Sequence, residues 1–265
     1  MHNRIDERFA RLRKEKRKGF IPYICAGDPT LKHTVDLAFA LEKGGADLIE
    51  LGLPFSDPLA DGIVNQLAAQ RSLTAGTTAR GVFDCVREIR RKSQIPIVLY
   101  SYLNPIFQFG AEKFHQQAEK AGVDGLLILD LPPEEDLDLG AGNLVHIRLI
   151  APTTPVDRMK KIAKSAKGFL YYVSREGVTG ARDSIATSLP QKIAELRKIS
   201  DLPVAVGFGI SNPQQAREVA QHADAVVVGS AIVDLIAKHG NSADLIEKVT
   251  AFSSKIAEAI KSLNR

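Results

Sequence analysis

The sequence predicts an α/β fold: a (β/α)8 TIM barrel formed by a single domain over residues 1–265, with an extra helix within residues 1–18 that packs on the barrel. Short apolar runs of strand length alternate strictly with segments of helical period, which is the pattern of a parallel sheet. Eight such units fit into 265 residues, a length typical of a closed barrel. The chain shows no linker and no low-complexity segment, which favours one domain.

Eight segments have the composition of strands that are covered on both faces. Leu126–Leu129 and Val226–Val228, for example, are uninterrupted apolar runs, as strands buried between two helical layers require. The expected strands are Phe20–Cys25, Asp47–Leu51, Ile95–Ser101, Val123–Leu129, Leu144–Ile150, Gly168–Val173, Pro203–Val206 and Asp224–Val228.

Segments with apolar residues at helical spacing separate these strands. The expected helices are Thr34–Lys43, Gly81–Lys92, Glu112–Lys120, Val156–Ser165, Ile185–Ile199, Pro213–Gln221 and a long final helix, Ser242–Leu263. The weakest crossover is Leu131–Asn143, because its prolines and glycines leave room for only a turn or two of helix.

The N-terminal segment is strongly basic. Residues 1–18 carry a net charge of +5, against +4 for the whole chain, and such an arm could bind nucleic acid. However, Ile5, Phe9 and Leu12 form one apolar stripe at helical spacing, and no aromatic or RNA-binding motif lies among the charges. A solvated helix that packs on the core is therefore favoured, and no nucleic-acid partner is expected.

Composition excludes several other classes. Hydrophobic residues make up 45% and charged residues 25%, as in ordinary globular proteins. No apolar run approaches the length of a membrane span, residues 1–18 lack the apolar core of a signal peptide, and the two cysteines, Cys25 and Cys85, cannot form a disulfide framework. We expect a cytoplasmic protein with no membrane partner.

Several kinds of chemistry lack the residues they need. The first βα turn has no GxGxxG, so a Rossmann dinucleotide site is not expected. No lysine ends a predicted strand, which disfavours a Schiff-base aldolase. The six histidines are scattered without metal-ligand spacing, so no metal is expected. Acid–base chemistry by carboxylates remains.

Glu50 is the first candidate, because the active residues of this fold lie at the carboxyl ends of the strands. It alternates with Ile49 and Leu51 along the second strand, so it faces the barrel interior if they face the helices. A buried carboxylate is costly unless it is paired or used. A structural role, bonded to a backbone donor or an arginine, is the alternative to a catalytic one.

The long loop after this strand supplies the second candidate carboxylate. Asp57 precedes a proline, as turn residues often do, and Asp61 precedes an apolar segment starting at Ile63, where it could cap a helix. Spacing alone does not decide which of the two aspartates partners Glu50.

Three glycine clusters in the last three βα loops predict a phosphate site. They are Gly177–Gly180, Gly207–Gly209 and Gly229-Ser230, and Ser230 stands where a short helix could begin. Glycine lets backbone N–H groups approach an anion closely, and barrels often bind phosphate after strands seven and eight. The first of these clusters lies in the segment Ser174–Thr187, which is small and polar enough to act as a mobile lid.

At these residues the sequence resembles the tryptophan synthase alpha chain family. The matching motifs run in the family's order over about residues 20–233. They are the run Glu50–Gly62 (ELGLPFSDPLADG), Gly27-Asp28-Pro29, Tyr102-Leu-Asn104-Pro, Asp130-Leu-Pro, Ser174–Gly180 (SREGVTG) and Gly207-Phe208-Gly209-Ile210-Ser. A dozen consecutive matching residues around two carboxylates make the resemblance highly specific.

The resemblance implies a (β/α)8 barrel that cleaves indole-3-glycerol phosphate to indole and glyceraldehyde 3-phosphate. It implies that Glu50 is the catalytic acid–base group and that Asp61 is the carboxylate at the indole nitrogen. Substrate-binding roles follow for Tyr23 at the indole pocket, for Tyr171, for Thr179 in the mobile loop, and for the phosphate residues Gly180, Gly209, Gly229 and Ser230. No cofactor is expected in this chain.

The resemblance also implies a partner. In the family, indole passes through a tunnel to a pyridoxal-phosphate beta chain, which suggests an alpha2beta2 tetramer.

Two features of the sequence depart from the family pattern. Ile63 and Asn65 stand where the family has a proline and a branched apolar residue, so the polarity of the indole pocket is expected to differ. The crossover 131–143 is shorter than usual and adjoins the partner-facing surface.

Three other functions compete. A stand-alone indole-releasing lyase would use the same residues without a beta chain. A phosphosugar isomerase would share the phosphate glycines but would need its acid–base pair near the first and fifth strands, which offer only Cys25 and Arg148. A non-catalytic phosphate-binding barrel would not need both Glu50 and Asp61.

Overall fold

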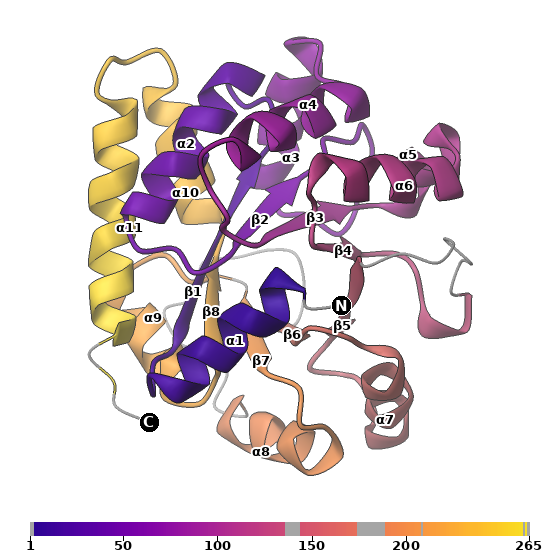
Figure 1. The fold of residues 1–265 in the computed structure, drawn as a ribbon. Coiled ribbons are helices and arrows are strands. Elements are labelled where there is room, and N and C mark those ends of the chain that lie inside the picture. Colours follow the sequence, from indigo (N-terminus) through magenta and orange to yellow (C-terminus); the bar gives the residue numbers. More distant parts are fainter. Residues whose placement is uncertain (1–2, 136–143, 174–188, 208, 262, 264–265) are drawn as a thin grey trace.

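A closed barrel of eight parallel strands forms the centre of the molecule (Figure 1). The computed structural model describes residues 3–135, 144–173, 189–207, 209–261 and 263. The strands pair in the order of the sequence, and β1 closes the barrel against β8. They are β1 (Gly19–Cys25), β2 (Ile49–Gly52), β3 (Ile97–Ser101), β4 (Gly125–Ile128), β5 (Val145–Ile150), β6 (Leu170–Val173), β7 (Val204–Gly207) and β8 (Ala225–Val228). The predicted TIM barrel is confirmed.

Helices surround the barrel and follow the strands along the chain (Figure 1). They are α1 (Arg4–Lys14), α2 (Leu31–Lys43), α3 (Ile63–Thr74), α4 (Ala79–Arg90), α5 (Leu103–Phe109), α6 (Ala111–Ala121), α7 (Val156–Ser165), α8 (Leu189–Ile199), α9 (Pro213–Ala220), α10 (Ser230–His239) and α11 (Leu245–Lys261). The described part of the weak crossover holds one 3-10 turn, Pro133–Glu135. No helix within the described residues is long and apolar enough to cross a membrane.

The sequence did not predict α5, and it predicted only the start of α3. The helix α5 has seven residues, and Pro105 is its third. Proline is tolerated in the first turn of a helix, where its missing N–H needs no partner, so Pro105 is compatible with this helix.

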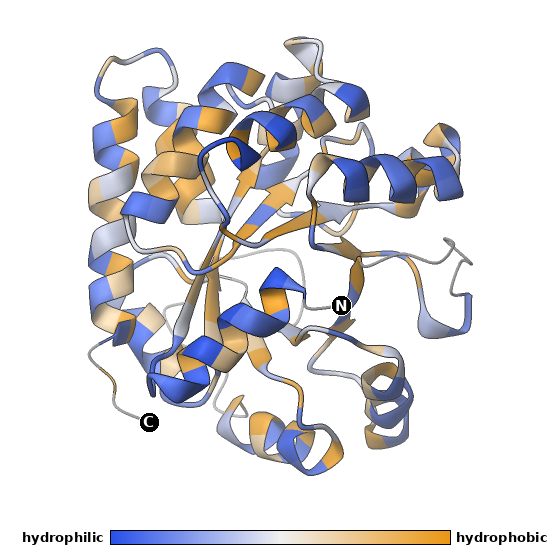
Figure 2. Ribbon diagram, in the orientation of Figure 1, coloured by the Kyte–Doolittle hydropathy of each residue, from blue (hydrophilic) through white to orange (hydrophobic). Residues whose placement is uncertain are grey.

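Side-chain alternation divides the core into two layers. The inward residues of the strands pack inside the barrel, and the outward residues pack against the helices. On β2, Ile49 and Leu51 belong to the outer layer, so Glu50, which alternates with them, faces the barrel interior. Figure 2 shows the apolar strands at the centre and mixed helices around them, whose hydrophilic residues form most of the periphery.

The helix α1 covers the amino-terminal end of the barrel. Ile5, Phe9 and Leu12 belong to the barrel-interior cluster, and the Phe9 and Phe169 rings lie 5.4 Å apart. Arg4 pairs with Asp124 just before β4, at 2.7 Å, and Arg8 pairs with Asp47 just before β2, at 3.3 Å.

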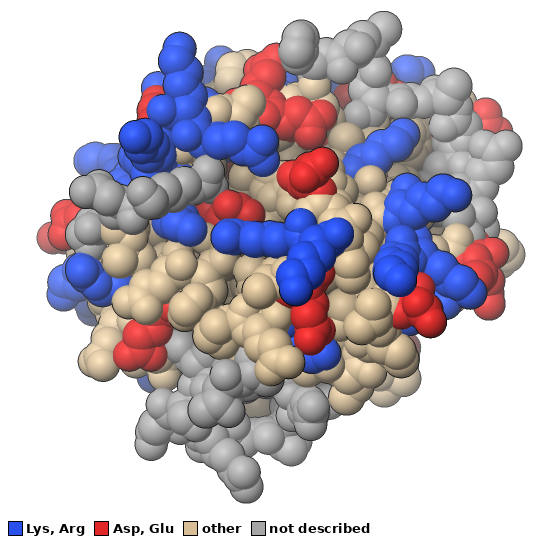
Figure 3. Space-filling model, turned by 90° about the horizontal axis from the view of Figure 1, so that it is seen from below, with Lys and Arg blue, Asp and Glu red and all other residues tan. Residues whose placement is uncertain are grey.

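The packed helix, rather than a nucleic-acid arm, therefore explains this basic segment. Several of its charged side chains form ion pairs within the fold. Figure 3, a view from below the orientation of Figure 1, shows Lys and Arg side chains interspersed with Asp and Glu. Such a mixed surface differs from the continuous basic patch that typifies nucleic-acid binding.

Candidate active site

Glu50 lies inside the barrel, in the middle of β2. It is level with Tyr23 on β1 and Val98 on β3, and only 1% of the residue is exposed. Its Oε1 atom is buried and accepts no hydrogen bond from any residue that the structure describes. Burial raises the pKa of Glu50 to about 8, because a charge in an apolar interior loses its hydration. The side chain is therefore a proton donor near neutral pH.

Asp61 is held at the barrel mouth by three side chains. The hydroxyl of Tyr100 donates to Oδ1 and that of Tyr102 to Oδ2, each at 2.8 Å, and the amide of Asn65 lies 3.4 Å from Oδ1. Burial raises the pKa of Asp61, and these three hydrogen bonds oppose the rise because they favour the charged form. The site thus holds two carboxyl groups in different surroundings.

The structure separates the two candidate aspartates. Asp61 is 4% exposed, whereas Asp57 is exposed and its Oδ2 accepts only from the adjacent Ser56 among the hydrogen bonds of the described residues. Asp61 is not the cap of α3 either. Gly62 occupies the N-cap position, and no side chain caps the helix there. Asp61 therefore does not have the helix-capping role that its sequence position suggested.

Two predicted substrate residues face the same space from the barrel wall. Tyr23 on β1 and Tyr171 on β6 belong to the barrel-interior cluster, and the Tyr23 ring packs edge-on against Tyr100 at 4.9 Å. Burial and the nearby carboxyls of Glu50 and Asp61 raise the pKa of both phenols far above the usual value. Both therefore present neutral hydroxyl groups.

The predicted phosphate residues lie partly within the described structure. Gly209 has a φ of +76°, which favours glycine, and Gly229 is the N-cap of α10, which begins at Ser230 as predicted. Gly229 lies close to Tyr23, since a Cβ there would be 3.5 Å from that ring. The amide groups of the first turn of α10 can therefore face an anion beside Tyr23. Thr179 and Gly180, with the whole predicted lid 174–187, lie outside the described residues.

Sequence reasoning missed Tyr100 and Tyr102. The signal was present, because the two tyrosines alternate at the end of β3 and its following residue and so point the same way. What the sequence did not show is that the loop after β2 folds back over them. The Tyr102 hydroxyl also accepts the Ala60 N–H at 3.0 Å, which fixes the loop beside Asp61.

The residues that an isomerase would need do not come together. Cys25 faces the barrel interior, whereas Arg148 alternates with the inward residues Val145 and Ile147 and so faces the helices. Burial also raises the pKa of the Cys25 thiol, so it is a poor nucleophile. The carboxyl pair remains the better candidate.

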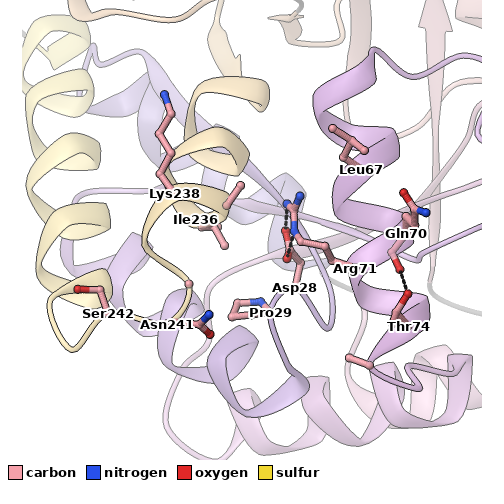
Figure 4. A pocket seen from close by; sticks show the side chains of 13 residues that line it. Asp28, Pro29, Leu67, Gln70, Arg71, Thr74, Ile236, Lys238, Asn241 and Ser242 are labelled. Carbon is pink, nitrogen blue, oxygen red and sulfur yellow. Dashed lines mark hydrogen bonds and ion pairs between the residues drawn. The ribbon is translucent and has the colours of Figure 1, made fainter.

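A pocket of about 800 Å³ lies away from these carboxyls, between α3 and α10 (Figure 4). At its base Arg71 donates two hydrogen bonds to Asp28, at 2.8 and 2.7 Å. The Arg71 guanidinium is already paired with a carboxylate, and the pocket wall contains both polar and apolar residues. The pocket therefore does not resemble the pair of buried carboxyls in the barrel. Its position shows that α3 has one face toward the candidate site and another toward a separate groove.

Comparisons with known proteins agree with this geometry. A profile of the family described as "Tryptophan synthase alpha chain" matches residues 9–261. The chain is 49% identical over 259 residues to a tryptophan synthase alpha chain of Opitutus terrae, covering 96% of each, and 47% identical over 262 residues to that of Geobacter sp. strain M21, covering 97% and 98%.

Solved structures are similar as well. A tryptophan synthase subunit alpha from Legionella pneumophila superposes with a TM-score of 0.89 at 39% identity, covering 99% of this chain and 100% of that one. A chain from the a2b2 complex of Pyrococcus furiosus gives a TM-score of 0.81 at 36% identity, covering 91% and 99%.

Proposed function

The chain belongs to the tryptophan synthase alpha chain family, and we propose the residues with which it performs that family's reaction. The chain is a lyase of tryptophan biosynthesis that cleaves indole-3-glycerol phosphate to indole and glyceraldehyde 3-phosphate and works with a beta chain. The roles of individual side chains, the stoichiometry of the assembly and its location in the cell are the proposal.

Glu50 is the general acid and base. Its pKa of about 8 keeps it protonated near neutral pH, so it can transfer a proton to carbon 3 of the indole ring. The resulting cation has a C=N⁺ bond that accepts the electron pair of the breaking C–C bond. The Glu50 carboxylate left after the first step can then take the proton of the glycerol hydroxyl, as a carbonyl forms and the aromatic indole is restored.

Asp61 stabilises the positive charge that develops on the ring nitrogen. The three donors around it keep the carboxylate in place and favour its ionised form. Both carboxyls are buried, but hydrogen bonds that favour the charged form act on Asp61, whereas desolvation is the cause that acts on Glu50. That difference between the two buried carboxyls is the observation that carries the assignment.

The remaining predicted residues bind the substrate. Tyr23 and Tyr171 line the indole space, and Gly209, Gly229 and Ser230 hold the phosphate through backbone N–H groups, with assistance from the Ser230 hydroxyl. In the same proposal Thr179 and Gly180 are substrate-binding residues, with Gly180 at the phosphate; both roles come from the family resemblance.

Three variants test the assignment of the carboxyls. Glu50→Gln should lower the rate of indole release 10²–10⁴-fold, the usual contribution of a general acid, with substrate binding nearly unchanged. Asp61→Asn should be severely impaired, whereas Asp57→Asn, which changes an exposed aspartate of the same loop, should keep most of its activity. Residual activity above about a tenth in Glu50→Gln, or a greater loss in Asp57→Asn than in Asp61→Asn, would refute the assignment.

The partner is a beta chain that carries pyridoxal phosphate, in an alpha2beta2 tetramer. Large apolar side chains around the barrel mouth support a docking surface there: Leu59 is 84% exposed, Ile63 65% and Phe107 67%. Exposed apolar groups of this size in one region often mark an interface. We place the assembly in the cytoplasm, since both cysteines are free thiols, as suits a reducing compartment. We also treat residues 1–265 as one domain that includes the N-terminal helix.

A further inference from the structure

Asn65 contacts the proposed indole carboxylate. Its Nδ2 lies 3.4 Å from Asp61 Oδ1. The opposite orientation of the amide would place two oxygens side by side, so this contact determines which end of Asn65 faces Asp61.

The position on α3 directs Asn65 to the barrel mouth. Ala68, Ala69 and Ser72 follow it at helical spacings of three, four and seven and are all buried. Ala68 and Ala69 belong to the barrel-interior cluster. Asn65 is therefore on the face of α3 that covers the barrel, whereas Gln70 lies on the face that borders the separate groove in Figure 4.

The oxygen of this amide has no protein partner among the described residues. Asn65 Oδ1 is buried and accepts no hydrogen bond there. A buried acceptor without a donor is costly, and a donor on a bound molecule removes that cost. An aliphatic residue at the same position would offer no such acceptor.

The hydrogen bonds to Asp61 indicate where the indole ring lies. A carboxylate has about four acceptor positions. Tyr100 and Asn65 occupy the two of Oδ1, and Tyr102 occupies one of Oδ2. Among the residues that the structure describes, none donates to the remaining position on Oδ2, which can accept the ring N–H. Asn65 is then next to the nitrogen-bearing edge of the indole, which includes carbon 7 of the benzo ring.

We propose that Asn65 determines the ring specificity of this enzyme: its nitrogen is held by Asp61, and its oxygen accepts a hydrogen bond from a hydroxyl or amino group on the benzo ring near the indole nitrogen. The enzyme should therefore use such polar indoles more efficiently than a variant with an aliphatic residue at position 65. The inference rests on the proposed role of Asp61.

The experiment runs the cleavage in reverse, joining indole or 4-, 5-, 6- or 7-hydroxyindole to glyceraldehyde 3-phosphate. Asn65→Leu replaces the amide by an apolar group of similar shape, and Gln70→Leu makes the same change on the other face of α3. For Asn65→Leu, the ratio of kcat/KM for 7-hydroxyindole to that for indole should fall about tenfold, roughly one hydrogen bond. Gln70→Leu should leave every ratio unchanged.

A further measurement follows the contact between Asn65 and Asp61 itself. Loss of the Asn65 donor in Asn65→Leu should also raise the pKa of Asp61, which moves the acidic limb of the kcat/KM profile to higher pH.

The outcomes for Asn65 and for the active site are distinguishable. If the unmodified chain joins indole to the aldehyde and Asp61→Asn does not, the active site is as proposed. Unchanged hydroxyindole ratios in Asn65→Leu would then overturn the Asn65 inference alone. If Asp61→Asn is fully active, the role of Asp61 is wrong, whatever the ratios show.

Discussion

At the scale of a single residue, the proposed role of Glu50 links the reaction to the stability of the protein. Its carboxyl group is buried, and its Oε1 accepts no hydrogen bond from the described residues. An acid kept in such a place is useful for proton transfer but unfavourable once it ionises. The same property that makes Glu50 a proton donor should therefore weaken the fold at high pH.

We expect Glu50→Gln to be more stable than the unmodified protein in alkaline solution. The pKa of Glu50 is raised from 4.5 to about 8 in the folded state, so between these values the folded protein binds more protons than the unfolded chain. Stability then falls as the pH rises through this window and levels off above it. Glutamine has no such titration.

Denaturant unfolding of both proteins at several pH values measures this difference. The stability advantage of Glu50→Gln should grow from about pH 4.5 to about pH 8 and then stay constant. Asp57→Asn, which changes an exposed carboxyl of the loop after β2, is the control variant. An advantage that does not depend on pH would contradict the raised pKa.

At the scale of elements, α3 and α10 each pack against the barrel and also contribute residues to the proposed site. The first turn of α3 presents Asn65 to Asp61, and Gln66 Nε2 donates to the Asp61 carbonyl at 2.8 Å. The start of α10 lies against Tyr23 through Gly229. A helix is stiff, so its packing against the barrel fixes the groups at its amino-terminal end to within narrow limits.

Gly209→Val tests the phosphate loop. A side chain at Gly209 would block close approach of the backbone to an anion, so the KM for indole-3-glycerol phosphate should rise sharply. The matched control is Gly76→Val. Gly76 has a similar φ, +81° against +76° for Gly209, and nothing lies within 4 Å of an added Cβ.

Both valine variants introduce the same kind of backbone strain, about 1–2 kcal/mol, so their free energies of unfolding should fall by similar amounts. Only Gly209→Val should show the higher KM in steady-state kinetics. A folded Gly209→Val protein with a KM equal to that of Gly76→Val would remove Gly209 from the phosphate site.

At the scale of the whole molecule, α1 and the barrel form one packed body. Leu12 is buried against the amino-terminal end of the barrel, where an added Cβ at Gly19 would lie 3.1 Å from its Cδ1. Leu12→Ala should lower the free energy of unfolding by about 2–5 kcal/mol, the usual cost of a cavity in a packed core. The exposed neighbour Arg13→Ala should change little.

Circular dichroism followed through a denaturant titration reports the barrel as well as α1. If α1 were a separate arm, Leu12→Ala would leave the main transition of the barrel unchanged. That result would contradict the proposal of one domain over residues 1–265.

Assembly with a beta chain is the second property of the whole molecule. Phe107 lies on α5 and is 67% exposed, while Tyr102, the N-cap of α5, holds the loop that carries Asp61. Phe107→Glu should weaken binding to the beta chain at least tenfold in a titration followed by calorimetry, because a charge would be buried at the interface. Indole release by the isolated alpha chain should be unaffected.

The matched control for this variant is Leu73→Glu, at the far end of α3, where the side chain is 37% exposed. It should bind the beta chain normally. Equal binding by both variants and the unmodified protein would exclude the surface around Phe107 as the docking site.

The sequence by itself determined the barrel, most of its elements and the opposite directions of Glu50 and its neighbours on β2. These features follow from local periodicity: strands repeat every two residues and helices every 3.6, so parity along β2 places Glu50 opposite Ile49 and Leu51. The seven-residue α5 was not predicted, because a helix that short contains too few residues to show a period.

Only the tertiary structure shows how Asp61, which the family resemblance implied, differs from Asp57. Asp57 and Asp61 occupy the same loop and look alike in sequence, but Asp61 alone is buried beneath Tyr100 and Tyr102. These tyrosines lie about forty residues further along the chain. Their contact with Asp61 exists because β2 and β3 are neighbours in a closed barrel, which brings their carboxyl ends to one rim. Side-chain contacts between distant segments depend on that closure, and no local pattern in the sequence specifies them.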